Sequence, residues 1–167
     1  DFLIAVDGGL GHLRRLGLTP NLLIGDLDSV DAAELADIAA AGVEIRRFPP
    51  AKDQTDLELA LDYALDFGYT QIVIAYPFGD RLDHTLGNLS LLSRPDLNSK
   101  TLSLEDGQVE ARLLRSGARF SSQPGELISL FAWGEPVQGI TTQRLEYPLR
   151  GETLIPWQTR GISNVAL

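Results

Sequence analysis

The chain of 167 residues contains no cysteine and no methionine. Without cysteine it can have no disulfide, no thiolate zinc site and no cysteine nucleophile. The absence fits a reducing compartment, and we expect a cytoplasmic protein. Asp1 opens directly onto a strand-like run and the chain stops as abruptly after Leu167, so we expect a fragment whose native ends are missing.

Long apolar runs and a surplus of positive charge are also absent. No apolar run approaches the length of a membrane span, so we expect no membrane partner. The 14 basic residues are outnumbered by 23 acidic ones, which gives a formal charge of −9. Such a balance argues against a general grip on nucleic acid, which needs a basic face. A polyphosphate ligand would need local positive charge from a metal, from Lys or Arg, or from backbone N–H groups.

Apolar runs alternate with helical periodicity up to about residue 100. Each run is continuous, as in strands covered on both faces, and each helical stretch ends near Gly or Pro. This rhythm predicts an α/β fold with a parallel, layered sheet. The predicted strands are 2–6, 22–24, 43–48 and 72–76, and the predicted helices are about 10–16, 31–41, 55–67 and 86–92.

After about residue 100 the helical periodicity disappears, and short apolar or alternating runs are separated by turn signals. The runs 127–131, 138–142 and 145–149 read as strands. We therefore expect an α/β domain over residues 1–108, followed by a smaller, incomplete, all-β, sandwich-like domain over residues 109–167.

Acidic side chains gather where predicted strands give way to helices. Asp26 and Asp28 follow one strand, and Asp53 and Asp56 follow another. The carboxyl ends of parallel strands share one edge of the sheet, where ligands bind. Clustered carboxylates would repel one another without a cation, and Mg²⁺ prefers such oxygen ligands, usually together with substrate phosphates. The sequence therefore favours a metal-assisted enzyme that acts on phosphates.

Helix capping offers an alternative reading of some of these residues. Asp28 or Ser29 could be an N-cap, and Asp56 would gain from the dipole of its helix. Thr55, with Glu58 three residues on, is already a sufficient cap. Asp53 therefore has no comparable structural explanation.

Two further corners carry polar groups. Asp7-Gly8-Gly9 ends the first strand in a turn where backbone N–H groups could approach a phosphate or a ribose. This segment matches neither a P-loop nor a dinucleotide fingerprint, and a plain turn is an alternative. Gly79 to Thr85 offers Arg81, Asp83 and His84 together, although Arg81 and Asp83 could equally form a loop salt bridge.

The succession of these corners resembles the thiamin pyrophosphokinase family, bacterial type. The segments that carry the resemblance are Asp7-Gly8-Gly9, Gly25 to Ser29, Lys52 to Asp56, Gly79 to Thr85 and Thr159 to Asn164. The resemblance implies transfer of a diphosphate group from ATP to the hydroxyl of thiamin, which gives thiamin diphosphate and AMP. It also implies a homodimer in which an α/β domain binds ATP and magnesium and a β-sandwich domain binds thiamin between subunits.

The same resemblance implies roles for individual residues. Asp26, Asp28 and Asp56 match magnesium-binding aspartates. The ATP-binding positions are Asp7, Gly8, Gly9, Lys52, Gln54, Thr55 and Arg81. Asp83, Ser163 and Asn164 match positions that contact thiamin. The implied catalytic residues are Asp53, Asp56, Arg81 and Asp83.

This chain departs from the family pattern in places. Tyr76-Pro77-Phe78 replaces a glycine-richer stretch, and Val165 stands where bacterial relatives usually carry an acidic residue. The alternatives are a magnesium-dependent nucleotide phosphohydrolase, which would release phosphate without thiamin, and a non-catalytic thiamin- or nucleotide-binding module.

Overall fold

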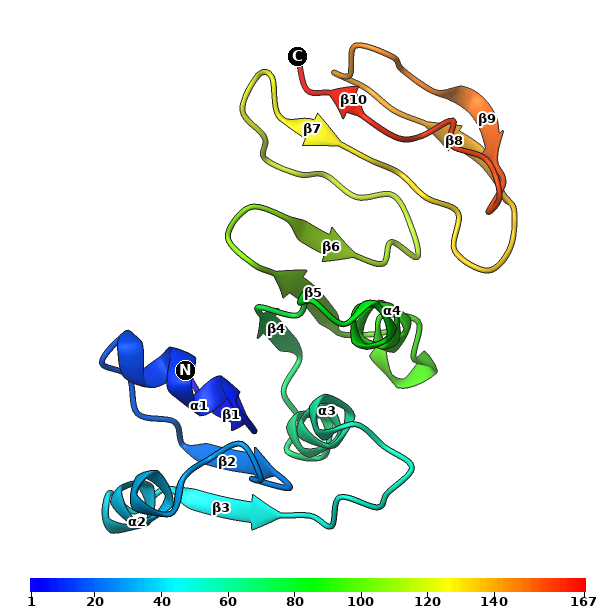
Figure 1. Ribbon diagram of the computed structural model, residues 1–167. Helices are drawn as coiled ribbons and strands as arrows, with labels where there is room; N and C mark the ends of the chain where they lie inside the picture. Colours follow the sequence, from blue (N-terminus) through cyan, green and yellow to red (C-terminus); the bar gives the residue numbers. More distant parts are fainter. The chain divides into compact units, whose positions relative to one another are not determined.

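The computed structural model describes residues 1–167 and contains two compact units, Asp1–Arg115 and Ser116–Leu167 (Figure 1). The boundary predicted after residue 108 precedes β6 (Glu110–Arg112), a strand that pairs with β5 (Thr101–Glu105) in the first unit. The other elements of the first unit are β1 (Ile4–Val6), α1 (Gly9–Arg15), β2 (Leu22–Gly25), α2 (Ala32–Ala40), β3 (Glu44–Arg47), α3 (Asp56–Asp66), β4 (Gln71–Ala75), α4 (Leu82–Leu91) and the short 3-10 helix Pro95–Leu97.

The first three strands form a parallel sheet in the order β1-β2-β3. Successive residues of β2 face opposite sides of the sheet, so Leu23 packs into a core with α1 and α2. Leu22 and Ile24 pack on the opposite side, against Ala60 and Tyr63 of α3. Helices thus cover both faces, which explains why β2 is a continuous run of buried residues.

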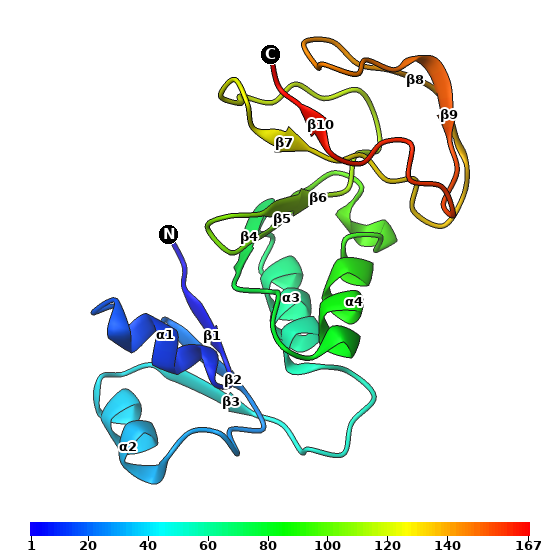
Figure 2. The same cartoon turned by 45° about the horizontal axis from the view of Figure 1, so that its top comes forward.

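A second sheet has the order β4-β5-β6, in which β4 and β5 are parallel and β6 is antiparallel. Leucines of α3 and α4 share one core with Ile74 of β4 and with Leu102 and Leu104 of β5. The two helices lie side by side (Figure 2). The alternation of strands and helices confirms the predicted α/β class with a parallel sheet.

Two helices begin at side-chain caps, and Thr55 is the cap that the sequence predicts. The Asp31 carboxylate accepts the N–H of Glu34 at 2.8 Å, and the Thr55 hydroxyl accepts that of Glu58 at 3.2 Å. Helix α4 begins at Leu82, one turn before the predicted start at Leu86, and its first turn is exposed. No helix combines the length and the apolar composition that a membrane crossing requires.

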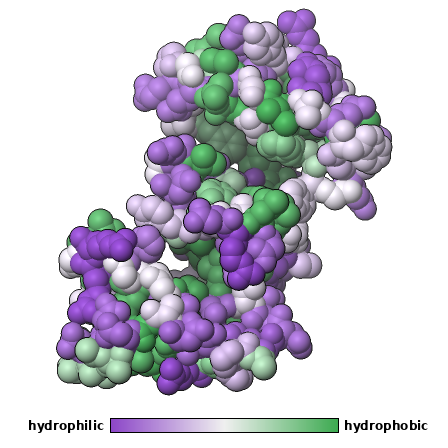
Figure 3. Space-filling view, in the orientation of Figure 1, coloured by the Kyte–Doolittle hydropathy of each residue, from purple (hydrophilic) through white to green (hydrophobic).

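The second unit is built only from short strands: β7 (Leu127–Ile128), β8 (Val137–Thr141), β9 (Arg150–Leu154) and β10 (Asn164–Val165). β7 pairs with β10 and β8 with β9, both antiparallel, around a small core that contains Ala132, Leu149 and Leu154. Among its hydrophobic side chains Leu127, Phe131 and Trp157 are strongly exposed. Figure 3 shows hydrophobic groups at the surface of this unit, among polar ones.

The predicted strand 145–149 is wrong. Leu145 makes only an isolated bridge to Ala166, and the regular strand is β9, which follows at Arg150. The Asn164 side chain accepts the N–H of Tyr147 and donates to its carbonyl, so this backbone bonds to a side chain rather than to a neighbouring strand. Pro148 has no N–H to donate to a ladder.

Candidate active site

The candidate site lies at the carboxyl ends of the parallel strands. Asp7 follows β1 and Asp26 follows β2, and these strands are paired so that Val6 lies opposite Ile24. The segment Lys52–Thr55 leads into α3, and the segment Tyr76–Arg81 joins β4 to α4. This is the edge where open α/β sheets bind their ligands.

Three carboxylates, those of Asp7, Asp26 and Asp28, each place an oxygen within 4.8 Å of the other two. Gly25 makes this approach possible: an added Cβ would lie 3.0 Å from the Cβ of Asp7, and Gly25 has a φ of 151°. Asp7 itself has a φ of 45° and donates its N–H to the carbonyl of Ile24 at 2.8 Å. The glycine before Asp26 therefore allows Asp7 to approach the Asp26–Asp28 pair.

The three carboxylates repel one another. The negative charge of Asp26 raises the pKa of Asp28 above its usual value, and burial and the charges of Asp7 and Asp56 add smaller effects. Oδ1 of Asp7 is buried and accepts no hydrogen bond. Asp31, and not Asp28 or Ser29, caps α2, so the capping explanation of Asp28 is ruled out.

Asp56 lies outside this group of three and has a cation of its own. Nζ of Lys52 lies 3.0 Å from Oδ1 of Asp56, and the two side chains are only 15% and 23% exposed. Their alignment is not that of a hydrogen bond, and Nζ donates instead to the carbonyl of Pro49 at 3.2 Å. Oδ1 of Asp56 is therefore a second buried oxygen with no hydrogen-bond donor.

These residues fit a divalent cation of the magnesium type. The donors are all carboxylate oxygens, two of the aspartates hold a buried oxygen that accepts no hydrogen bond, and the neighbouring carboxylates raise the pKa of Asp28. Asp7 joins the carboxylates predicted to bind metal, where the sequence alone predicts only ATP binding. The position of Asp7 could have indicated this, because Asp7 follows β1, and β1 pairs with β2, the strand that Asp26 follows.

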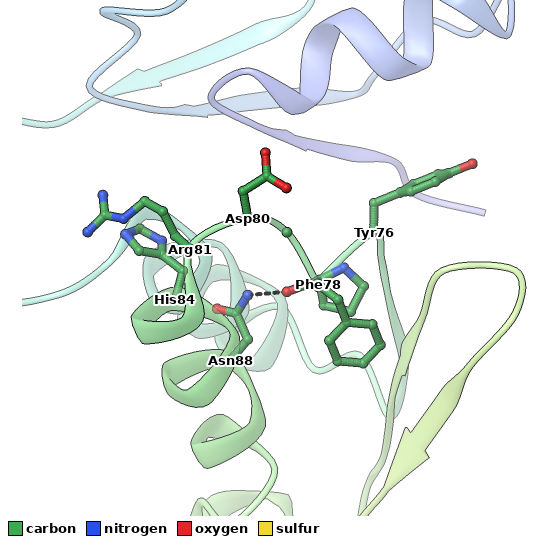
Figure 4. A pocket seen from close by; sticks show the side chains of 8 residues that line it. Tyr76, Phe78, Asp80, Arg81, His84 and Asn88 are labelled. Atoms are coloured by element: carbon green, nitrogen blue, oxygen red, sulfur yellow. Dashed lines mark hydrogen bonds between the residues drawn. The ribbon is translucent and has the colours of Figure 1, made fainter.

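The corner after β4 contains a pocket of about 300 Å³, lined by Tyr76–Arg81 and by His84 and Asn88 of α4 (Figure 4). Asn88 closes the loop by donating to the carbonyl of Pro77 at 2.7 Å. Tyr76 has a φ of 56° and stacks on the ring of His12, with centroids 5.1 Å apart. Figure 4 shows Tyr76 pointing away from Arg81 and His84.

Arg81 and Asp83 form the local ion pair that the sequence left open. Nη2 of Arg81 lies 2.5 Å from Oδ2 of Asp83, and the side chains are 69% and 65% exposed. Hydrogen bonding to Arg81 lowers the pKa of Asp83 below its usual value. Both groups are accessible to a ligand.

The remaining predicted site residues of the first unit differ in whether their side chains are already bonded within the protein. Asp53 is exposed, whereas the hydroxyl of Thr55 caps α3. The amide nitrogen of Gln54 donates to Asp62 of α3 at 2.7 Å. Gly8 precedes α1 as its N-cap, and Gly9 is the first residue of that helix.

In the second unit, Ser163 is exposed and has a φ of 56°. Asn164 is buried, with 5% of its surface exposed, and both ends of its amide bond to Tyr147. Gly161 is required for a close approach, because an added Cβ would lie 2.2 Å from the carbonyl oxygen of Leu130. The turn Gly161–Asn164 is thus tightly held within its unit.

Comparison with known proteins agrees with this arrangement. The family model described as the catalytic domain of thiamin pyrophosphokinase matches residues 1–104. Thiamine pyrophosphokinase of Bacillus subtilis (strain 168) is 32% identical over 164 residues, which cover 96% of this chain and 76% of the relative.

Solved structures extend the likeness to the fold. The crystal structure of the thiamine pyrophosphokinase from Bacillus subtilis superposes with a TM-score of 0.87 at 32% identity, over 99% of this chain and 78% of that one. Thiamin pyrophosphokinase from Candida albicans has the same fold, with a TM-score of 0.77 at 17% identity over 99% and 75% of the two chains. The chain described here therefore belongs to the thiamin pyrophosphokinase family.

Proposed function

We propose that this chain transfers a diphosphate group from ATP to the hydroxyl of thiamin. The hydroxyl oxygen bonds to the β-phosphorus, the bond from that phosphorus to the oxygen of the α-phosphate breaks, and AMP leaves; the hydroxyl proton is released. Family membership supports this reaction. The observation that carries it in the structure is the group of carboxylates Asp7, Asp26 and Asp28 at the ligand-binding edge of the sheet.

Asp26 and Asp28, with Asp7 beside them and Asp56 at the start of α3, would hold magnesium. When bound, the metal would neutralise phosphate charge and help to orient the polyphosphate. The buried oxygens of Asp7 and Asp56 that accept no hydrogen bond support this assignment. Without a cation the same carboxylates would repel the phosphates of ATP.

Lys52 and Arg81 are the cations that would contact the polyphosphate. Each is engaged by an aspartate in the structure, Lys52 by Asp56 and Arg81 by Asp83. Binding of an anion would draw the two side chains toward phosphate oxygens, where they offset the charge that builds up on the departing AMP. The backbone at Gly8 and Gly9, beside Asp7, would approach the nucleotide without side-chain obstruction.

Asp53 and Asp83 are the carboxylates that remain for proton transfer, Asp83 once Arg81 has left it for a phosphate oxygen. Both are exposed, and Asp83 is paired with Arg81, which lines the pocket formed by Tyr76–Arg81. Asp83 would bind thiamin and accept the proton of its hydroxyl group. Asp53 would act beside the phosphates of ATP. On the second unit, Ser163 would contact thiamin directly, and the buried Asn164 would keep its turn in place.

We also propose that the protein is a homodimer. The exposed Leu127, Phe131 and Trp157 support this, because their side chains are 72%, 65% and 78% accessible in the single chain. Light scattering at micromolar concentration should give twice the mass of the chain. A monomer at all concentrations would contradict the proposed assembly, and the products formed from ATP and thiamin test the reaction separately.

The reaction is tested by mass identification of the products from ATP, thiamin and magnesium. The proposal requires AMP and thiamin diphosphate, each dependent on thiamin and on the metal. ADP with thiamin monophosphate would refute it, and release of inorganic phosphate without thiamin would indicate a phosphohydrolase. Calorimetric binding of thiamin or ATP without any turnover would indicate a binding module.

A further inference from the structure

A chain of polar side chains connects the loop Lys52–Thr55 to the region between α3 and α4. Nε2 of Gln54 donates to Oδ2 of Asp62 at 2.7 Å, and Oδ1 of Asp62 lies 2.6 Å from Nη1 of Arg94. The network is partly buried, since the side chains of Arg94 and Asp62 are 22% and 33% exposed. Asp62 and Arg94 belong to none of the motifs at the candidate site.

The chemistry of the network fixes the orientation of the Gln54 amide. An ionised carboxylate can only accept hydrogen bonds, so the amino group of Gln54 must face Asp62. Asp62 lies in the second half of α3, about 9 Å along the helix axis from Asp56. The side chain of Gln54 therefore runs back along α3, away from the start of the helix, where Asp56 lies.

Arg94 makes this anchor rigid. Its Nε and Nη2 also bond to Asp96, at 3.1 and 2.6 Å, and its own carbonyl accepts from Arg115 at 3.0 Å. Ionised partners make such hydrogen bonds stronger than those between neutral groups. Gln54 is thus tied to a charged group that is itself held from several sides.

We propose that Asp62 and Arg94 are positioning residues of the active site. Acting through Gln54, they hold the loop that carries Lys52 and Asp53 against the start of α3. Gln54 then supports this loop and does not contact the phosphates of ATP. The inference rests on the proposed function for the roles of Lys52 and Asp53, whereas the anchoring of the loop can be measured without any turnover.

The test exchanges donor and acceptor within the network. Gln54→Glu places two carboxylates in contact and should push the loop away. Asp62→Asn leaves one carbonyl oxygen for two donors, Gln54 and Arg94. The double variant Gln54→Glu/Asp62→Asn restores a matched pair with the net charge unchanged, because the new amide on α3 would donate to the new carboxylate on the loop and accept from Arg94.

Each single variant should raise the KM for ATP by about tenfold, the effect of losing one charge-assisted hydrogen bond, with a smaller change in kcat. The double variant should return the KM to within about threefold of the wild type, because coupled residues are non-additive. If Gln54 instead contacted phosphate, the negative charge of Gln54→Glu would remain harmful in the double variant, and this outcome would overturn the proposal.

Asp96→Asn is the matched control. It makes the same chemical change on the other side of Arg94, and Asp96 makes no direct contact with Gln54 or Asp62. Its KM for ATP should stay within about twofold of the wild type. An increase as large as that of Asp62→Asn would show that any disturbance of Arg94 suffices, and would overturn a specific role for the Asp62–Gln54 contact.

Hydrogen exchange of the peptide that contains residues 52–55 gives the readout without catalysis. Exchange should become faster in both single variants and return toward the wild-type rate in the double variant. If Asp62→Asn fails to fold, Gln54→Ala, which truncates only the loop side chain, should show the same faster exchange. Wild-type exchange rates in the single variants would overturn the anchor, whereas absence of AMP in the wild type, with the predicted exchange pattern intact, would refute only the proposed function.

Discussion

The carboxylates at the two corners of the candidate site differ in what neutralises them. The carboxylates of Asp7, Asp26 and Asp28 form no ion pair, although Arg47 donates to the backbone carbonyl of Asp26 at 3.1 Å, and the pKa of Asp28 is raised. Asp56 has the ammonium of Lys52 at 3.0 Å. The first group therefore needs a cation from solution, whereas the second has a cation in the chain that must be shared or displaced when the metal and ATP bind.

The largest expected effect is that of Asp26→Asn. The variant should lose more than about 100-fold in kcat/KM, since even residues behind a metal ligand cost 10–100-fold when replaced. In the presence of a chelator the melting temperature of the variant should rise, because one of the three mutually repelling carboxylate charges has been removed. Steady-state assays of AMP formation and thermal melts with and without magnesium measure both effects.

Asp56→Asn sharpens the contrast. It should also abolish most activity, but its melting temperature in the chelator should fall, because Lys52 loses its partner in a partly buried position. Asp66→Asn, at the exposed end of α3, is the control and should leave both readouts unchanged. A fall in stability for Asp26→Asn equal to that for Asp56→Asn would remove the distinction between the two corners.

The second expected effect concerns the geometry of the first group. Gly25→Ala would place a Cβ 3.0 Å from that of Asp7, at a φ of 151°, and should displace Asp7 from Asp26 and Asp28. We expect about a tenfold or greater loss of magnesium affinity, measured by the magnesium dependence of turnover.

Gly42→Ala is the matched control for this change. Gly42 also has a positive φ, 77°, but an added Cβ would meet nothing within 4 Å. Its variant should lose stability without losing magnesium affinity. Equal magnesium dependence in the two glycine variants would show that Asp7 does not need its close approach to Asp26.

A smaller effect is expected for Lys52→Met, which removes the internal cation of the second corner. In the absence of metal the buried oxygen of Asp56 loses its nearest positive charge, so unfolding by urea should show a loss of about 1–3 kcal/mol. Magnesium should recover part of this loss, because the metal replaces the missing charge. Stability that does not respond to magnesium in the variant would separate Lys52 from the metal site.

The sequence was a good guide wherever a local pattern decides the structure. Thr55 caps α3 as predicted, because a cap depends on residues three positions apart. Asp26, Asp53 and Arg81 each lie between a strand and the helix that follows it, as the alternation of apolar runs and helical periodicity predicts. Conversely, the strand predicted at 145–149 failed because the buried Asn164, far along the chain, takes the backbone bonds of Tyr147.

Contacts between residues far apart in the sequence explain the features of the site that the sequence did not predict. The pairing of β1 with β2, rather than any local motif, brings Asp7 to Asp26 and Asp28. Likewise, Gln54 has the character of a phosphate-loop residue in sequence, yet Asp62 and Arg94 determine where its amide points. No local periodicity reports such partners, so the composition of the candidate site was more predictable than its internal bonding.

The smallest expected effect is that of replacing Asp83, in the third corner, because its ion pair with Arg81 is exposed to solvent. Its pKa is lowered chiefly by the hydrogen bond from Arg81, so its contribution to stability is present above the ordinary carboxyl pKa of about 3.9 and is lost as the pH falls through the lowered value. Because the pair is 69% and 65% exposed, Asp83→Asn should shift the melting temperature at neutral pH by no more than about 2 °C.

The stability of the wild type and of Asp83→Asn should therefore differ by the same small amount above about pH 5 and converge only below about pH 4. The KM for thiamin should nevertheless rise in the variant, because Asp83 is proposed to contact that substrate. A gain in stability like that expected for Asp26→Asn would mean that Asp83 also carries uncompensated charge, and that the contrast between crowded and paired carboxylates does not extend to the corner after β4.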